Sequence, residues 1–187
     1  MASSSISETI PRHANWIMTS SGRALDPFAP DPAQIALDDI AHHLSHVCRF
    51  AGAVSVHYSV AQHSVLVAQE MPLYARFALL HDAAEAYIGD VPRPLKRHQT
   101  FAAYRDVEAH LQAVIYRKFG IVPEPDGIVE LAHVDRRMLR TEQRDLMPAE
   151  LPGEGRDDAE PYLYHVVPWT PQEACSRFEQ AWEEATT

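Results

Sequence analysis

The segment ALLHDAAEAYIGDVPRPLK, residues 78–96, places a histidine, two aspartates and a glutamate within ten positions directly after an apolar run. Adjacent side chains on a helix project about 100° apart, so His81 and Asp82 can both reach a metal ion beside it. Glu85 returns to the face of His81 one turn later, where a carboxylate can transfer a proton without being a ligand. Asp90 follows in a loop at the rim of the same face. Solvated helix surfaces also carry His-Asp pairs, so the choice between a metal site and a solvated surface depends on residues elsewhere in the chain.

The hydrophobic pattern around this segment is helical. Apolar residues recur at helical spacing over residues 35–50. Further helices are predicted over residues 58–71 with a Ser59 cap, 74–89 ending at Gly89, 99–119, 126–149, and from a Thr170 cap onward. Alternation around a Ser-Gly pair predicts a short hairpin within residues 15–27. The sequence therefore predicts an all-α fold with a small N-terminal hairpin, in which residues 1–30 form an extension and residues 31–187 one helical domain.

The bulk composition limits the classes of partner. A chain of 187 residues suffices for one domain with a sizeable core. Its formal net charge of -10 argues against a large nucleic-acid-binding face, which needs a basic surplus, but not against a small phosphorylated ligand. Cys48 and Cys175 are far apart, no apolar run is long enough for a membrane span, and the first residues lack the features of a signal peptide. We therefore expect a cytoplasmic protein without a membrane partner.

Two residues outside the opening segment suit a metal site. His63 lies among apolar residues of the predicted helix over 58–71, and Asp135 lies among apolar residues of the predicted helix over 126–149. Both side chains are therefore expected to face inward. Together with His81 and Asp82 they supply two imidazoles and two carboxylates. Such a mixed set suits Mn²⁺, Co²⁺, Fe²⁺ or Zn²⁺ and leaves positions for water and a phosphate oxygen.

A second histidine cluster is also compatible with metal binding. His42 and His46 lie one turn apart on a predicted helix and can bind an ion together. No carboxylate completes an HExxH pattern there, so a surface role is the favoured interpretation.

The combined motifs resemble the HD-domain phosphohydrolases, all-α metal-dependent hydrolases named after a His-Asp pair. The stretches CRFAGAVSVHYSVAQHSVLVA (48–68) and LLHDAAEAYIGDVPRPLK (79–96) look like the branch of bacterial and prophage 5'-deoxynucleotidase-like proteins. The resemblance covers about residues 16–150. It implies a divalent metal ion (Co, Mn, Zn or Fe), a nucleotide substrate and a homodimer or higher homo-oligomer. It also implies roles for individual residues: His63, His81, Asp82 and Asp135 as metal ligands, and Glu85 and Asp90 as the groups that transfer protons.

The same resemblance implies three substrate contacts. Arg49 matches a residue at the phosphate or the sugar edge, and a guanidinium suits bidentate phosphate contact. Phe50 stands where relatives often carry an aromatic residue that packs on the sugar. Its ring can exclude a 2'-hydroxyl without hydrogen-bonding it, so selectivity for deoxyribose stays open. Lys96 is a candidate for a second phosphate contact, with a solvated lysine as the alternative.

The expected reaction is hydrolysis of a deoxynucleoside 5'-monophosphate to deoxynucleoside and phosphate. One alternative within the same superfamily is a triphosphohydrolase that releases tripolyphosphate from a deoxynucleoside triphosphate such as dATP. The scarcity of basic residues near the motif favours the monophosphate. A second alternative, from a different class, is a non-catalytic protein that binds a nucleotide or a partner.

Overall fold

The computed structural model describes residues 15–149 and 159–186. The first fourteen residues of the predicted extension therefore lie outside the described part of the chain. The elements are β1 (Ile17–Met18), β2 (Ala24–Leu25), α1 (Leu37–His46), α2 (Val60–Gln69), α3 (Ala75–Leu79), α4 (Glu85–Ile88), α5 (Arg93–Arg97), α6 (Ala102–Lys118), α7 (Pro125–Leu146) and α8 (Pro171–Glu184). The prediction of an all-α fold with a small N-terminal hairpin is confirmed.

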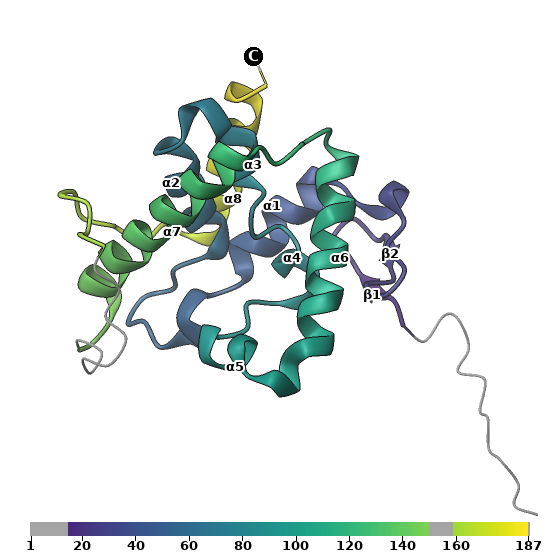
Figure 1. Cartoon of the computed structure of the whole chain (residues 1–187), viewed down its shortest axis with the longest axis horizontal. Helices are drawn as coiled ribbons and strands as arrows, with labels where there is room; N and C mark the ends of the chain where they lie inside the picture. Colours follow the sequence, from purple (N-terminus) through teal and green to yellow (C-terminus); the bar gives the residue numbers. More distant parts are fainter. Residues whose placement is uncertain (1–14, 150–158, 187) are drawn as a thin grey trace, which may run out of the picture.

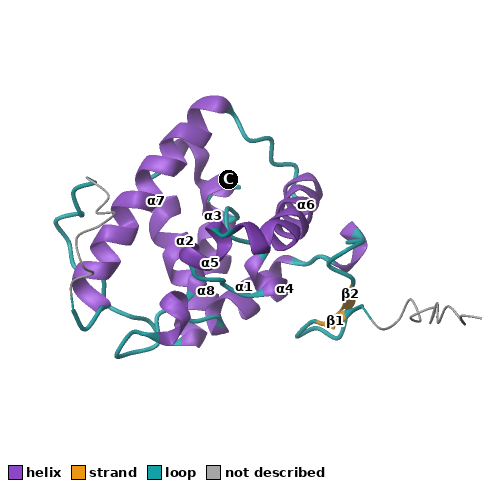
Figure 2. Ribbon diagram, turned by 60° about the horizontal axis from the view of Figure 1, so that its bottom comes forward, coloured by secondary structure: helices purple, strands orange, loops and turns teal. Residues whose placement is uncertain are grey.

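Helix α7 lies on one side of the molecule and α6 on the other, with α1 and α8 between them (Figures 1 and 2). Helices α3, α7 and α8 pack against α2, while α4 and α8 pack against α1. Eight of the ten residues of α2 are buried, including His63. A helix that is buried on nearly all sides places its polar side chains in the interior, where they need partners.

Local signals start and end several helices as predicted. The Ser59 hydroxyl accepts a hydrogen bond from the backbone N–H of Gln62 and caps α2. Thr170 caps α8 in the same manner through Glu173 N–H. Gly89 follows the end of α4 at a φ of 79°, a left-handed conformation that glycine adopts without steric cost.

The predicted helix over residues 74–89 is wrong as one continuous element. Helix α3 ends at Leu79, and α4 begins at Glu85 after a tight turn that carries His81 and Asp82. Gln112 of α6 holds this turn open, because its side chain accepts from Ala84 N–H at 3.0 Å and donates to the Leu80 carbonyl at 2.7 Å. The backbone groups that a continuous helix would pair are thus bound by a side chain from another helix.

The hairpin is tied to α1 by a buried carboxylate. Asp39 accepts hydrogen bonds from the hydroxyls of Ser20 and Ser21, each at 2.7 Å, and from Ser21 N–H at 2.8 Å. His43 of α1 connects the hairpin to α4. Its Nε2 accepts a hydrogen bond from Ser20 N–H, and its Nδ1 donates to the Ala86 carbonyl in α4. The turn between β1 and β2 is therefore connected to the helix that begins with Glu85.

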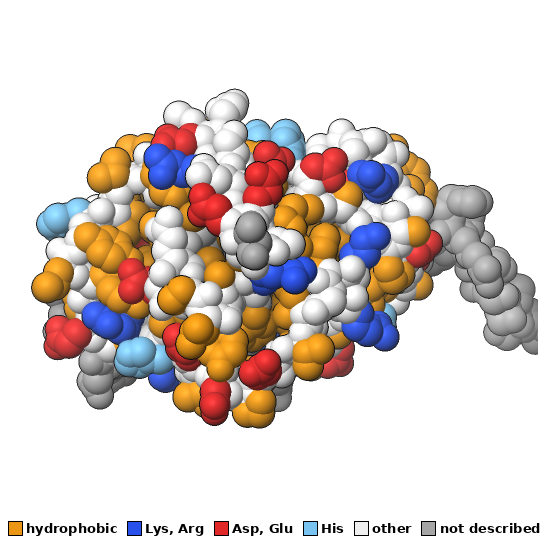
Figure 3. Space-filling model, turned by 90° about the horizontal axis from the view of Figure 1, so that it is seen from above, with side chains coloured by type: hydrophobic (Ala, Val, Ile, Leu, Met, Phe, Trp, Pro, Cys, Tyr) orange, Lys and Arg blue, Asp and Glu red, His pale blue; other side chains and the backbone are white. Residues whose placement is uncertain are grey.

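The outer surface is mixed in character. Figure 3 shows one face, on which acidic, basic and apolar side chains are interspersed. Among the described helices, none combines the length and the apolar character that a membrane span requires.

Candidate metal centre

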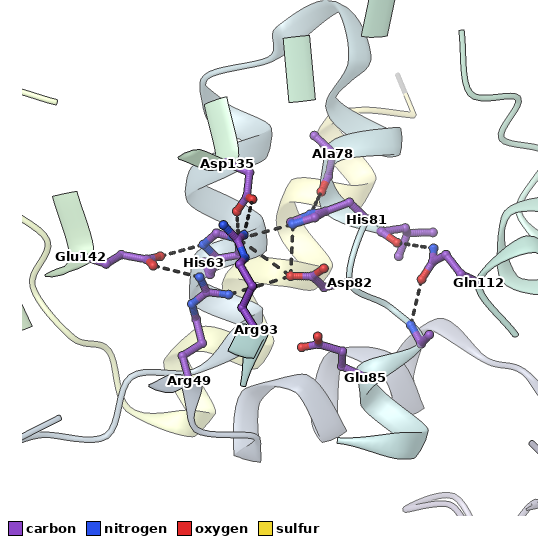
Figure 4. Close-up of polar contacts among 12 residues, drawn as sticks. Arg49, His63, Ala78, His81, Asp82, Glu85, Arg93, Gln112, Asp135 and Glu142 are labelled. Atoms are coloured by element: carbon purple, nitrogen blue, oxygen red, sulfur yellow. Dashed lines mark hydrogen bonds and ion pairs between the residues drawn. The ribbon is translucent and has the colours of Figure 1, made fainter. Parts of the chain in front are cut away.

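Three side chains from separate parts of the chain direct donor atoms to one place. His63 comes from α2, Asp135 from α7, and His81 from the turn after α3. The Nε2 atom of His63 lies 3.3 Å from Nε2 of His81 and 3.3 Å from Oδ1 of Asp135. The three donor atoms all lie within 4.8 Å of one another (Figure 4). His63, His81 and Asp135, called the metal group below, can therefore hold a metal ion.

Asp82 lies at the edge of the metal group. Its Oδ2 is 3.1 Å from Nε2 of His81 and 3.8 Å from Nε2 of His63. The structure therefore brings the four predicted ligands together, although they come from three different parts of the chain.

Both imidazole rings present the nitrogen that a metal ion needs. His63 Nδ1 lies 2.6 Å from Oε1 of Glu142, and His81 Nδ1 lies 2.7 Å from the Ala78 carbonyl oxygen. Carboxylate and carbonyl oxygens accept hydrogen bonds, so Nδ1 carries the proton in each ring. In its neutral form each ring then turns an unprotonated Nε2 toward the metal group, as metal-binding histidines with a second hydrogen-bonded nitrogen do. Two imidazole nitrogens with carboxylate oxygens suit the transition-metal ions named above.

The electrostatics of the metal group balance its carboxylates against its imidazoles. Burial opposes ionisation of Asp82, but His81, His63 and Arg49 together outweigh it and hold the pKa of Asp82 well below its usual range. Asp135 likewise has a lowered pKa, because His63 and His81 together outweigh its burial. Burial also disfavours protonation of His81, but Asp82, Asp135 and the hydrogen bond to the Ala78 carbonyl together overcome this effect and raise the pKa of His81 to about 9. Protons and a metal ion therefore compete for the same nitrogens.

Arg49, the predicted phosphate contact, lies beside the metal group. Its backbone N–H donates to the Tyr58 carbonyl at 2.9 Å, which ties it to the start of α2. One guanidinium nitrogen lies 3.0 Å from Oε2 of Glu142, and another lies 3.8 Å from Oδ2 of Asp82. The guanidinium therefore adjoins a predicted ligand, where an anion bound to the metal group would meet it.

Phe50 continues from Arg49 in an unusual backbone conformation. Its φ is 57°, and those of Ala51 and Gly52 are 51° and 77°. Residues other than glycine rarely adopt this left-handed region. The Arg49 guanidinium carbon lies 5.5 Å from the centroid of the Phe50 ring, so the two predicted substrate contacts are neighbours.

Glu85, the predicted proton-transferring residue, is buried at the start of α4. Its Oε1 lies 2.6 Å from Nζ of Lys96, while its Oε2 is buried without a hydrogen-bond partner among the residues that the structure describes. Burial raises the pKa of Glu85 to about 8, aided by the charges of Asp82 and Asp90 and opposed by Lys96. Figure 4 shows Glu85 on the α4 side of Asp82.

Three further charged residues surround this arrangement. Lys96, predicted as a phosphate contact, donates to Glu85 and also to Glu108 of α6 at 2.7 Å. The second predicted acid, Asp90, is half-buried in the loop after α4 and acts on Glu85 through its charge. Arg93 of α5 lies 3.2 Å from Oδ2 of Asp135 and is 46% exposed. Asp135 is 22% exposed beside it, so the metal group is partly open to solvent on this side.

Comparisons with known proteins place the chain in a family. No family model matches the sequence. Over 181 residues the chain is 37% identical to YfdR, an uncharacterized protein of Escherichia coli strain K12, with 91% of this chain and 95% of that protein covered. The chain belongs to the YfdR family. An uncharacterized protein of Rhodobacter capsulatus, RCAP_rcc00048, is 36% identical over 126 residues, which are 59% of this chain and 62% of that protein. Neither name states an activity.

Sequence reasoning missed two residues that shape this site in the YfdR-family chain. Glu142 lies seven residues after Asp135 on α7, so two helical turns return it to the same face, and this spacing is a signal that the sequence contains. Gln112 carries no such signal, because only the tertiary structure brings α6 to the turn at residues 80–84. The His42 and His46 rings lie with centroids 4.4 Å apart and planes tilted by 31°, but both side chains are exposed and lie outside the metal group.

Proposed function

We propose that this protein is a metal-dependent phosphohydrolase of the HD-domain type, and that it hydrolyses deoxynucleoside 5'-monophosphates. The observation that carries the proposal is the convergence of His63, His81 and Asp135 with both Nε2 atoms turned to one place. The largely buried Arg49 side chain and the Glu85 carboxylate with one unpartnered oxygen adjoin this place. Metal binding, anion binding and proton transfer are the three tasks of phosphate ester hydrolysis, and the residues for each lie together.

Each residue has a chemical task in this proposal. A bound divalent ion would lower the pKa of water and neutralise phosphate oxygens. Arg49 holds negative charge on the phosphate from the side of Asp82. Glu85 has a pKa of about 8, so its carboxyl group can hold or accept a proton near neutral pH. Its unpartnered Oε2 is the atom where that proton is carried.

The pairing of the nearby cations supports a monophosphate rather than a triphosphate. Arg49 contacts Glu142, Lys96 contacts Glu85 and Glu108, and Arg93 contacts Asp135. Each of these three cations already has a carboxylate partner. A triphosphate carries several negative charges in a row, and its recognition needs more cations than one phosphate group does.

The decisive experiment is product analysis. Protein loaded with Mn²⁺, Co²⁺ or Zn²⁺ is incubated in parallel with dAMP, AMP, dATP and ATP, and the products are separated by chromatography. We expect deoxyadenosine and inorganic phosphate from dAMP. Glu85→Gln should bind metal as the wild type does and lose turnover by about 10²-fold or more.

Other products would replace the proposal. Deoxyadenosine and intact tripolyphosphate from dATP, with dAMP unchanged, would make the protein a triphosphohydrolase. No product from any of the four nucleotides, with metal bound, would indicate a binding protein. Release of adenosine from AMP at the same rate would remove deoxyribose selectivity from the proposal.

A further inference from the structure

Glu142 is a fully buried carboxylate that joins two halves of the site. Its Oε1 accepts hydrogen bonds from His63 Nδ1 at 2.6 Å and from the Tyr58 hydroxyl at 2.7 Å. Its Oε2 accepts from the Arg49 guanidinium at 3.0 Å. A buried charge without partners is strongly destabilising, and here three donors from two other parts of the chain compensate it.

We propose that Glu142 is a positioning residue that sets the metal ligand His63 and the anion-binding Arg49 at the same time. The half that concerns Arg49 rests on the function proposed above, whereas the half that concerns His63 needs only metal binding. Glu142 touches neither the metal group's centre nor a substrate directly. It acts through the orientation of the two side chains that do.

The effect on His63 follows from its hydrogen bond. Oε1 of Glu142 accepts a hydrogen bond from Nδ1–H of His63. The neutral ring therefore has its lone pair on Nε2, the atom 3.3 Å from Oδ1 of Asp135. The same hydrogen bond fixes the plane of the ring and increases the basicity of Nε2. A carboxylate at this position therefore selects the tautomer that binds metal.

The effect on Arg49 uses the other oxygen. Oε2 binds one guanidinium nitrogen, and this leaves the nitrogen that lies 3.8 Å from Oδ2 of Asp82 on the side of the metal group. The Arg49 side chain is 11% exposed, so little of it faces solvent. The pairing with Glu142 therefore restricts the orientation of its guanidinium.

An amide at position 142 cannot satisfy both halves. If the amide oxygen of Glu142→Gln faces His63, its NH₂ group faces Arg49, and two donors oppose each other. If the amide is reversed, its NH₂ group faces His63 Nδ1, which then accepts. The proton moves to Nε2 and blocks metal binding. Either orientation of the amide disrupts the pairing with His63 or the pairing with Arg49. The isosteric variant Glu142→Gln is therefore a direct test.

The test measures metal affinity without substrate. Zn²⁺ affinity is determined for the full chain by competition with a chromophoric chelator, and the Co²⁺ form is compared by its visible absorption spectrum. We expect Glu142→Gln and Glu142→Asp to bind Zn²⁺ about 10- to 100-fold more weakly, with an altered Co²⁺ spectrum. Tyr58→Phe is the matched control, since it removes a donor to Oε1 but leaves His63 and Arg49 paired, and its Zn²⁺ affinity should stay within about threefold.

Inorganic phosphate tests the second half. In metal-saturated protein, we expect Glu142→Gln to bind inorganic phosphate about tenfold more weakly than Tyr58→Phe. Circular dichroism establishes that each variant is folded. If neither variant at position 142 folds, histidine ¹⁵N shifts of the metal-loaded wild type test the tautomer directly, with a protonated Nδ1 expected at His63.

Wild-type Zn²⁺ affinity and an unchanged Co²⁺ spectrum in folded Glu142→Gln would overturn the inference, as would an unprotonated Nδ1 at His63. Its failure is distinguishable from failure of the proposed function. Weakened metal binding without hydrolysis of dAMP by the wild type would retain the role of Glu142 and remove the activity. Hydrolysis of dAMP by the wild type, with unchanged metal binding in the variant, would retain the activity and remove the role of Glu142.

Discussion

Lys96 and Glu85 form a 2.6 Å ion pair between α5 and α4, and the same ammonium group reaches Glu108 of α6 at 2.7 Å. The pair occupies one oxygen of Glu85 and leaves the other buried and unpartnered among the described residues. Lys96 favours the charged form of Glu85, whereas burial and the neighbouring carboxylates favour the neutral form and prevail. The carboxyl group is therefore held in place by a cation and yet retains a proton near neutral pH.

Replacing Glu85 should stabilise the metal-free protein at high pH. The pKa of Glu85 is about 8 in the folded chain and 4.5 in the reference state, so the folded state binds the extra proton between these values. The free energy of unfolding of the wild type then falls as the pH rises from about 5 to 8. Glu85→Gln lacks this loss, and we expect it to be more stable at pH 8 by on the order of 2 kcal/mol. Urea unfolding at pH 5 and pH 8, with chelator present, measures the difference, and an equal difference at both values would contradict the assignment.

Replacing Lys96 separates its two candidate roles. If Lys96 positions Glu85, Lys96→Met lowers kcat for dAMP by about tenfold or more and leaves KM unchanged, because proton transfer suffers and binding does not. Lys96→Arg should recover part of the rate, since it keeps a cation between Glu85 and Glu108. Steady-state kinetics of the three proteins decide the question. A raised KM with unchanged kcat would instead support the phosphate contact predicted from the sequence.

Gln112 should be necessary for the turn that carries His81 and Asp82. Gln112→Leu leaves the Ala84 N–H and the Leu80 carbonyl without their side-chain partner, and we expect it to destabilise the fold by about 2–3 kcal/mol. Zn²⁺ binding should weaken as well. Gln180→Leu, at an exposed position of α8, is the control, and denaturant unfolding with chelator competition provides both measurements. Unchanged Zn²⁺ affinity in a destabilised Gln112→Leu would show that the turn keeps its shape without Gln112.

Asp39 should make the attachment of the hairpin dependent on pH. Burial opposes its ionisation, but the hydroxyls of Ser20 and Ser21, Ser21 N–H and Thr19 together outweigh it and hold the pKa of Asp39 below its usual range. A carboxyl with a depressed folded-state pKa contributes stability above the unfolded pKa of about 3.9 and loses it as the pH falls. We therefore expect Asp39→Asn to cost about 2 kcal/mol at pH 7, and this deficit to shrink as the pH falls below about 4.

The neighbouring Asp38 provides the control for this measurement, because it is exposed on the same helix. Asp38→Asn should change the free energy of unfolding by less than about 0.5 kcal/mol at either pH. Unfolding curves at pH 7 and pH 3 for the two variants and the wild type test the prediction. A deficit of Asp39→Asn that is the same at both pH values would argue that shape, and not charge, holds the hairpin.

The sequence by itself determined the features that depend on residues close together in the chain. Helical periodicity and the caps at Ser59 and Thr170 are such features, because a cap hydroxyl bonds a backbone group three residues away. The inward-facing positions of His63 and Asp135 followed from their apolar neighbours. A polar side chain on a buried face needs a partner, and this requirement indicated that His63 and Asp135 are candidate metal ligands.

Only the tertiary structure decided how these residues act together. The helix break at His81 depends on Gln112, and the partner of Lys96 is Glu85 rather than solvent. Glu142 binds His63 and Arg49, which lie 79 and 93 positions earlier in the chain. Local preferences favoured one continuous helix and left Lys96 open between a phosphate contact and a solvated side chain. Buried polar groups must find partners wherever packing brings them, and the energy of those contacts exceeds the small differences in local propensity.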